Sequence, residues 1–298
     1  MGRDVYAASA ATREVFDAAD SVLGFSLSRL CFEGPEDELV RTENQQPAIL
    51  TTSIALLRAL EERGPVETGL MAGHSLGEYS ALVAVGALSF EDAVKLVAAR
   101  GRFMQEAVPQ GHGAMAAVIG CEPTVVAQCC DTVARETGQV VAPANYNSPV
   151  QTVIAGNAAA VELACTRVKQ EGAQRTVPLP VSAPFHCPLM ARAAEKLALE
   201  LGGVTFADTQ TPVVTNVEAT ANTDGARVAG LLKQQVTAPV RFVEMIAAMT
   251  AAGADRVLEI GPGRVLTGLV RRIDRNIARG NLSDASELEA AASFAAAA

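Results

Sequence analysis

The feature that most constrains the fold of this chain is a serine between two glycines, in Gly73-His74-Ser75-Leu76-Gly77. A short apolar run over 68–72 precedes it, and a helix-like run over 78–88 follows it. A strand that turns into a helix over so few residues needs small side chains at the turn, and the turn lifts the serine hydroxyl above the sheet. The Leu76 N–H then faces any oxyanion at the positive end of the following helix. The segment therefore predicts an α/β fold with a nucleophilic serine, and it does not separate hydrolysis from acyl transfer.

The periodicity of the chain changes at Gly111 and again after Ala183. Between these points the pattern predicts strand, helix, two strands joined as a hairpin, helix and strand, which is the ferredoxin-like order. We therefore expect a small ferredoxin-like subdomain over 111–183, inserted into a large α/β-hydrolase-like catalytic subdomain over 1–110 and 184–298 with a parallel sheet at its core. The alanine-rich end, 280–298, is predicted to be a disordered tail.

Composition excludes several classes of protein. With 298 residues and a formal net charge of -9, the chain has no basic domain that would neutralise nucleic-acid phosphates. No apolar run approaches the length of a membrane span, and no export signal is recognisable, so a cytoplasmic protein with reduced cysteines is expected. Three histidines without metal-ligand spacing make a metal site improbable.

A serine nucleophile needs a base, and only three histidines are available. His74 adjoins the nucleophile, where its side chain should point away and pack or hydrogen-bond beneath the turn. His112 lies between two glycines and is expected to be a solvated loop residue. His186 lies in a loop stiffened by Pro184 and Pro188. By elimination, His186 is the predicted base.

Arg100 interrupts the apolar stripe of a helix predicted to run from Ser89 to about Val108. A buried guanidinium needs an anion or a route to water. Its partner is either an Asp or Glu of the chain or the carboxylate of a substrate, since guanidinium binds carboxylates bidentately. Spacing alone leaves both interpretations open.

With these residues in place, the chain closely resembles the malonyl-CoA:acyl carrier protein transacylases of bacterial fatty-acid synthesis. The resemblance runs in family order from about residue 2 to residue 275 and is far more specific than a bare GxSxG motif. The matching strings are Gln46-Pro47-Ala48, MAGHSLGEYSAL around Ser75, ARGRFMQEAVP around Arg100, GAMAAVIG from Gly113, NYNSPVQTVIAG from Asn145, LPVSAPFHCPLM around His186 and EIGPGRVLTGL from Glu259.

The resemblance implies the same two-part fold and a ping-pong reaction in which Ser75 accepts malonyl from coenzyme A and passes it to the pantetheine thiol of acyl carrier protein. His186 would act as base and then acid, and the backbone carbonyl of Gln235 would take the third triad position. Arg100 would pair with the malonyl carboxylate, and Phe185 would leave less room for an α-methyl branch. No cofactor is implied, because the coenzyme A thioester is a substrate.

The N-terminal region departs from the family pattern. Members begin with a strand and a Gly-Gln-Gly-Ser-Gln loop ahead of the segment that matches Met1–Asp4, and neither is in this sequence. A glutamine of that loop supplies the second oxyanion-hole N–H, so Leu76 is the one backbone donor that can be named. We expect Met1 to be an internal methionine or the sequence to be truncated, with the missing segment encoded upstream.

Two alternatives to malonyl transfer remain at this point. One is a serine esterase or thioesterase that uses the same turn. The other is a truncated, low-activity form that only binds acyl-CoA or carrier protein. The expected partners are malonyl-CoA and acyl carrier protein, without nucleic acid or membrane, and the protein is expected to be a monomer.

Overall fold

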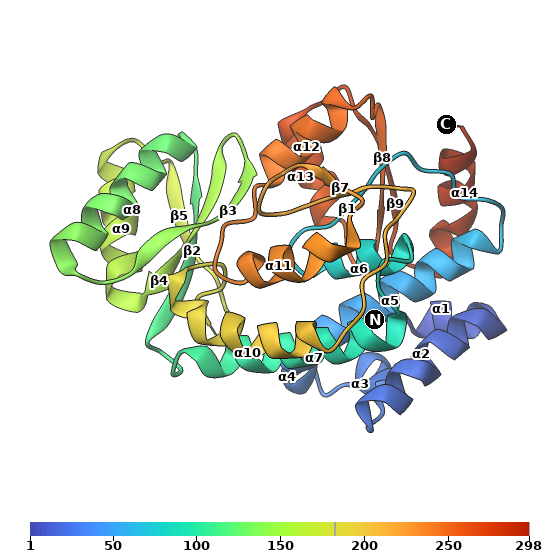
Figure 1. The fold of residues 1–298 in the computed structure, drawn as a ribbon. Helices are drawn as coiled ribbons and strands as arrows, with labels where there is room; N and C mark the ends of the chain where they lie inside the picture. The colour runs from blue at the N-terminus through green and yellow to red at the C-terminus, as the bar shows by residue number, and fades with distance from the viewer. Residues whose placement is uncertain (182, 298) are drawn as a thin grey trace.

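A computed structural model describes residues 1–181 and 183–297 of the chain, so Ser182, in the loop ahead of His186, lies outside the described residues. The molecule has two parts, which Figure 1 shows side by side, with the smaller part in green and yellow-green. Over the described residues, no helix combines the length and the apolar character that crossing a membrane would need.

The larger part contains short strands in parallel pairs. β1 (Met71–Ala72) runs parallel to β6 (Val213–Val214), which also pairs with the antiparallel β7 (Ala221–Asn222). β8 (Arg256–Ile260) runs parallel to β9 (Ala278–Leu282). Parallel pairs surrounded by helices confirm the predicted α/β class. The apolar run over 68–72 contributes only its last two residues to the sheet.

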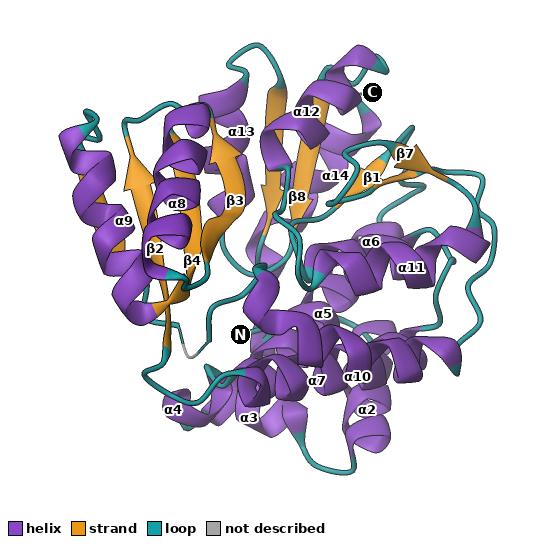
Figure 2. Ribbon diagram, turned by 60° about the vertical axis from the view of Figure 1, so that its left-hand side comes forward, coloured by secondary structure: helices purple, strands orange, loops and turns teal. Residues whose placement is uncertain are grey.

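Helices cover these strands on both sides (Figure 2). The long α5 (Thr42–Glu61) is buried along most of its length, because α2, α6 and α7 pack around it. The other helices of this part are α1 (Arg3–Ala8), α2 (Ala10–Leu23), α3 (Leu27–Glu33), α4 (Glu36–Leu39), α6 (Gly77–Ala84), α7 (Phe90–Ala107), η1 (Pro188–Met190), α10 (Ala191–Gly202), α11 (Gly225–Gln235), α12 (Phe242–Ala251), α13 (Val265–Ile273), η2 (Ala285–Glu287) and α14 (Leu288–Ala296).

The smaller part is an antiparallel sheet in the order β3-β4-β2-β5 with two helices on one face, which confirms the ferredoxin-like prediction. Alternate residues of each strand face opposite sides. Ala116 and Val118 of β2 pack under the two helices, whereas Met115 and Ala117 contact the loop that carries Phe185 and Cys187. The elements are β2 (Gly113–Ile119), α8 (Pro123–Thr137), β3 (Val141–Ser148), β4 (Gln151–Asn157), α9 (Ala158–Gln170) and β5 (Arg175–Pro178).

The prediction of a disordered tail over 280–298 is wrong for the described residues of that range. β9 extends to Leu282, and α14 packs against α5 and β9 with Leu288 and Ala291 buried. Alanine is the strongest helix former, and an apolar side at three-residue spacing lets an alanine-rich segment dock as a helix.

Candidate active site

The serine of the Gly73–Gly77 segment lies on a strained turn between β1 and α6. Ser75 has a φ of 53°, in the left-handed region that residues other than glycine rarely adopt. Gly73 makes the turn possible, since a Cβ at that position would lie 1.9 Å from the carbonyl carbon of Gly77. The sequence therefore folds here as predicted, with glycine required where the strand end meets the helix start.

Replacing Gly73 by alanine should lower the free energy of unfolding by about 3 kcal/mol or more, because the new methyl would meet backbone atoms that no side-chain rotation can move. Urea denaturation measures the effect. Gly77→Ala is the matched control, since a Cβ at Gly77 has no neighbour within 4 Å, and the control should stay close to wild type. Equal losses in the two variants would contradict the close-approach explanation.

Ser75, His186 and Gln235 form a continuous hydrogen-bonded relay. His186 Nε2 lies 2.7 Å from Ser75 Oγ, and His186 Nδ1 lies 2.8 Å from the backbone carbonyl oxygen of Gln235. A carbonyl oxygen only accepts, so Nδ1 carries the proton and Nε2 is left to accept the proton of Ser75. Burial, reinforced by the Arg100 cation, lowers the pKa of His186 to about 3. The imidazole is therefore neutral near pH 7, the state that a general base requires.

Arg100 lies beside the same hydroxyl, deep in the protein and only 2% exposed. Its NH2 donates to Ser75 Oγ at 2.9 Å and to Gln235 Oε1 at 3.0 Å, and its NH1 donates to Gln46 Oε1 at 2.5 Å. All three acceptors are uncharged. No described carboxylate forms an ion pair with Arg100, and its Nε has no partner among the described residues. The spacing left two possible partners for Arg100, an acidic residue of the chain or a substrate carboxylate. The structure does not show the ion pair with an acidic residue among the described residues.

The other residues considered in the sequence analysis do not contact the Ser75 hydroxyl through a hydrogen bond in the structure. Leu76 is the N-cap of α6, where backbone N–H groups have no acceptor within the helix, and its own N–H bonds to none of the described residues. Phe185 is half-buried and packs against the cores of both parts; its selectivity role stays a prediction. His74 points away from the nucleophile, as predicted, with Nε2 2.8 Å from Asn147 Oδ1. His112 is exposed.

Three buried polar residues in the site were not predicted as site residues. Gln46 contacts Arg100, Asn216 contacts the turn at Ser75, and Glu78 contacts Gln235. Burial raises the pKa of Glu78 to about 7. The signal for Gln46 was a polar side chain on an otherwise buried helix, next to Pro47. Glu78 gave no signal, because an acidic residue in the first turn of a helix normally indicates a favourable dipole contact.

Comparison with known proteins places this geometry in a family. Residues 1–291 match the acyl transferase domain, and the chain belongs to that family. Two curated relatives are malonyl CoA-acyl carrier protein transacylases. That of Escherichia coli is 46% identical over 291 residues, covering 98% of this chain and 94% of the relative. That of Bacillus subtilis is 48% identical over 291 residues, covering 98% and 91%.

Solved structures agree with the curated relatives. A type II PKS acyl-carrier protein in complex with its malonyl-transacylase matches with a TM-score of 0.95 at 44% identity, over 99% of this chain and 94% of that one. An acyl carrier protein S-malonyltransferase from Vibrio cholerae matches with a TM-score of 0.94 at 43% identity, over 97% and 94%.

Proposed function

We infer that this protein is an acyltransferase that moves a malonyl group from coenzyme A to the pantetheine thiol of acyl carrier protein, through a malonyl ester of Ser75. The observation that carries the assignment is the Arg100 cation, which is buried, forms no ion pair with a carboxylate of the described residues, and donates to the Ser75 hydroxyl. A carboxylate on the acyl group supplies the missing anion. Family membership and relatives that are named for this reaction support the same assignment.

In the first half-reaction, Ser75 Oγ attacks the thioester carbonyl of malonyl-CoA while its proton passes to His186 Nε2. The carbonyl of Gln235 holds the imidazole through Nδ1 and stabilises the imidazolium. The Leu76 N–H donates to the oxyanion of the tetrahedral intermediate. The C–S bond then breaks, and the coenzyme A sulfur leaves with the proton from His186.

In the second half-reaction, the thiol of the carrier protein gives its proton to His186 Nε2 and its sulfur attacks the malonyl ester. Ser75 Oγ leaves and recovers that proton, which restores the starting site. The thioester of coenzyme A supplies the activated acyl group, so the proposed cycle needs no cofactor. Arg100 holds the malonyl carboxylate through both steps, and Phe185 limits the room beside the malonyl methylene.

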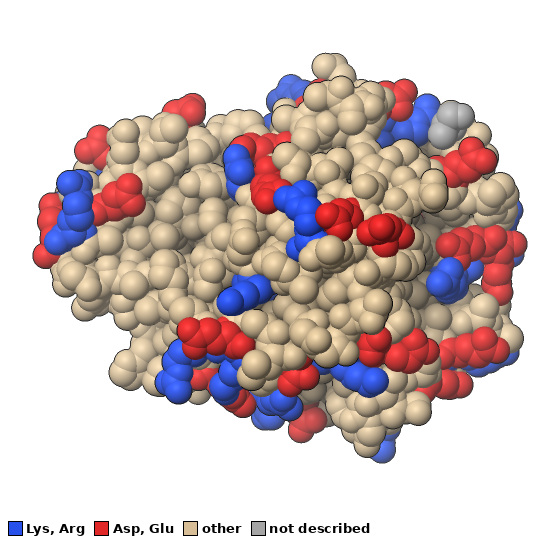
Figure 3. Space-filling model, in the orientation of Figure 1, with Lys and Arg blue, Asp and Glu red and all other residues tan. Residues whose placement is uncertain are grey.

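The proposal includes a monomeric, cytoplasmic enzyme whose partners are malonyl-CoA and acyl carrier protein, without nucleic acid or membrane. Surface charge supports the exclusion of nucleic acid. On the face seen in Figure 3, the described Lys and Arg side chains are interspersed with Asp and Glu and form no continuous basic surface.

Intact-mass measurement after mixing with malonyl-CoA tests the assignment. The wild-type chain should gain one malonyl group, and Ser75→Ala should gain none. Addition of carrier protein should remove the group and malonylate the carrier. Release of free malonate at the rate of transfer would favour an esterase or thioesterase, and absence of any adduct on the wild-type chain would leave only a binding function.

A further inference from the structure

The loop between β6 and β7 lies beside the nucleophile turn, because β6 is the parallel neighbour of β1 in the sheet. Its Asn216 is fully buried, and its side chain contacts the backbone at Ser75 and at Gly73. The Oδ1 atom accepts a hydrogen bond from the Ser75 N–H at 2.7 Å, and the Nδ2 group donates to the carbonyl oxygen of Gly73 at 2.7 Å. One amide thus satisfies two backbone groups that neither β1 nor α6 can pair.

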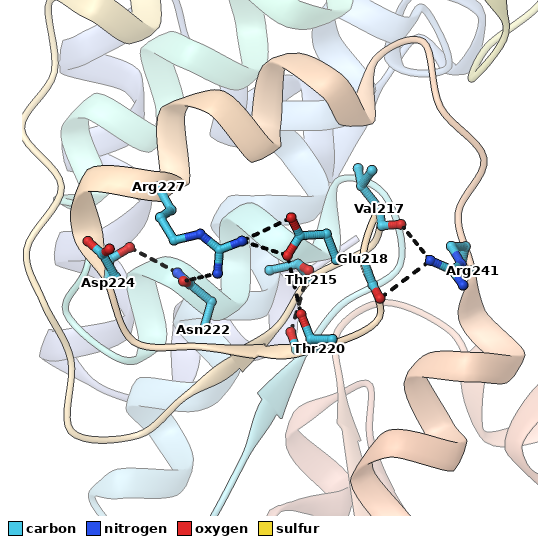
Figure 4. Close-up of polar contacts among 8 residues, drawn as sticks. All are labelled: Thr215, Val217, Glu218, Thr220, Asn222, Asp224, Arg227 and Arg241. Carbon is cyan, nitrogen blue, oxygen red and sulfur yellow. Dashed lines mark hydrogen bonds and ion pairs between the residues drawn. The ribbon is translucent and has the colours of Figure 1, made fainter.

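Two arginines hold this loop in place (Figure 4). Arg227, on α11, donates to both carboxylate oxygens of Glu218, at 2.9 and 2.7 Å. Arg241 donates to the carbonyl oxygens of Val217 and Glu218, at 3.2 and 3.4 Å. The two residues that follow Asn216 are therefore tied to α11 and to the N-cap of α12, so the amide is presented to the turn from a fixed support.

Glu78 connects the Asn216 backbone to Gln235, and so to the rest of the site. Its Oε2 accepts from the backbone N–H of Asn216 at 3.2 Å and from Gln235 Nε2 at 2.7 Å. The same Gln235 amide donates to the carbonyl oxygen of Ser75 at 3.0 Å and accepts from Arg100. Because a carboxylate accepts and a guanidinium only donates, the orientation of the Gln235 amide is determined by its two neighbours.

We propose that Asn216 and Glu78 are positioning residues for acyl transfer. Asn216 holds Ser75 in its left-handed conformation, and Glu78 holds Gln235 so that its backbone carbonyl stays on His186. A left-handed conformation is unfavourable for a residue other than glycine, and two hydrogen bonds to otherwise unpaired buried groups offset that strain. This inference rests on the proposed function, since it assigns roles within that reaction.

Loss of a positioning residue lowers the rate of acyl transfer, whereas loss of a residue that only stabilises the fold lowers the stability of the protein. If Asn216 is replaced by alanine, the Ser75 backbone can relax, and displacement of a nucleophile by about 1 Å lowers a rate by about 10²-fold. Binding of malonyl-CoA through Arg100 should be affected far less. We therefore expect the loss in kcat, with KM for malonyl-CoA nearly unchanged.

The experiment compares Asn216→Ala with Asn222→Ala, a buried asparagine of the same hairpin that contacts Arg227 and Asp224 instead of the turn. Steady-state kinetics with malonyl-CoA and carrier protein give kcat and KM, and thermal melting gives Tm. Asn216→Ala should lose about 10²-fold in kcat, whereas Asn222→Ala should keep its kcat even where its Tm falls as far. Equal kcat losses at equal Tm, or an unchanged kcat in Asn216→Ala, would overturn the proposal.

Variants of Glu78 provide a second test, which does not require the Asn216 variants to fold. Glu78→Gln retains an oxygen that accepts from Gln235, and Glu78→Ala does not. The glutamine variant should keep most of the kcat that the alanine variant loses. If both lose kcat to the same extent, Glu78 does not act by holding Gln235.

Labelling of Ser75 by a fluorophosphonate separates this inference from the proposed function. Ser75 Oγ gives its proton to His186 Nε2 and forms an O–P bond with the reagent, the P–F bond breaks and fluoride leaves, and the reaction needs no carboxylate recognition. Slower labelling of Asn216→Ala than of Asn222→Ala supports positioning even where the wild-type chain takes no malonyl group. A wild-type chain that is malonylated, with equal labelling of the two variants, would reject the inference and leave the proposed function standing.

Discussion

Replacement of His186 by alanine should lower kcat for malonyl transfer by about 10⁴- to 10⁶-fold, because both half-reactions move a proton through this one imidazole. No other histidine can take over. His74 Nε2 is bound to Asn147, and His112 is exposed on a separate loop. Single-turnover formation of the malonyl-Ser75 adduct, followed by mass, measures the loss directly.

His112→Ala is the control for this experiment, and it should behave as wild type. The pH dependence of folding stability gives a second measurement, because burial lowers the pKa of His186 to about 3. Since the folded-state pKa lies below the ordinary value of 6.5, the base stays neutral in the folded protein as the pH falls through 6.5. The unfolded chain takes up a proton at that pH, so the free energy of unfolding falls progressively between pH 6.5 and pH 3. Residual activity above 1% of wild type in His186→Ala would remove His186 from the role of base.

The parts of the site that sequence could predict are those that a short segment determines alone. Gly73 and Gly77 flank Ser75, and the sharp turn between strand and helix leaves no room for a Cβ at Gly73. Arg100 was identifiable because it interrupts an apolar stripe within its own helix. His186 followed from elimination among three histidines, and the contact of its Nδ1 with Gln235 was anticipated only through the family resemblance.

The unpredicted parts arise from contacts between distant segments. Asn216 reaches Ser75 across 141 positions, and Gln235 reaches Glu78 across 157. No local pattern marks which asparagine or glutamate will end in such a contact. The same limit explains α14, whose order comes from docking on α5 and β9 and is not visible in an alanine-rich sequence.

Arg100→Ala should lower kcat/KM for malonyl-CoA by about 10²-fold or more, since charge-assisted hydrogen bonds to a carboxylate contribute about 1.5–3 kcal/mol each. Acylation of Ser75 from an equimolar mixture of malonyl- and acetyl-CoA, resolved by mass, reports the selectivity. Arg102→Ala, an exposed arginine on the same helix, is the matched control and should discriminate as wild type does. Unchanged discrimination in Arg100→Ala would place the malonyl carboxylate elsewhere.

The same variant should also acylate faster from acetyl-CoA than the wild-type chain does. After burial, the Arg100 cation is the next largest cause of the lowered pKa of His186. A malonyl carboxylate that pairs with Arg100 cancels this charge and raises the basicity of the imidazole, whereas an acetyl group leaves it uncancelled. Discrimination then arises in the chemical step as well as in binding. Arg100→Lys keeps the charge and should therefore keep acetyl transfer slow, and an acetyl rate that is no higher in Arg100→Ala than in Arg100→Lys, at equal folded fraction, would refute this coupling between the two residues.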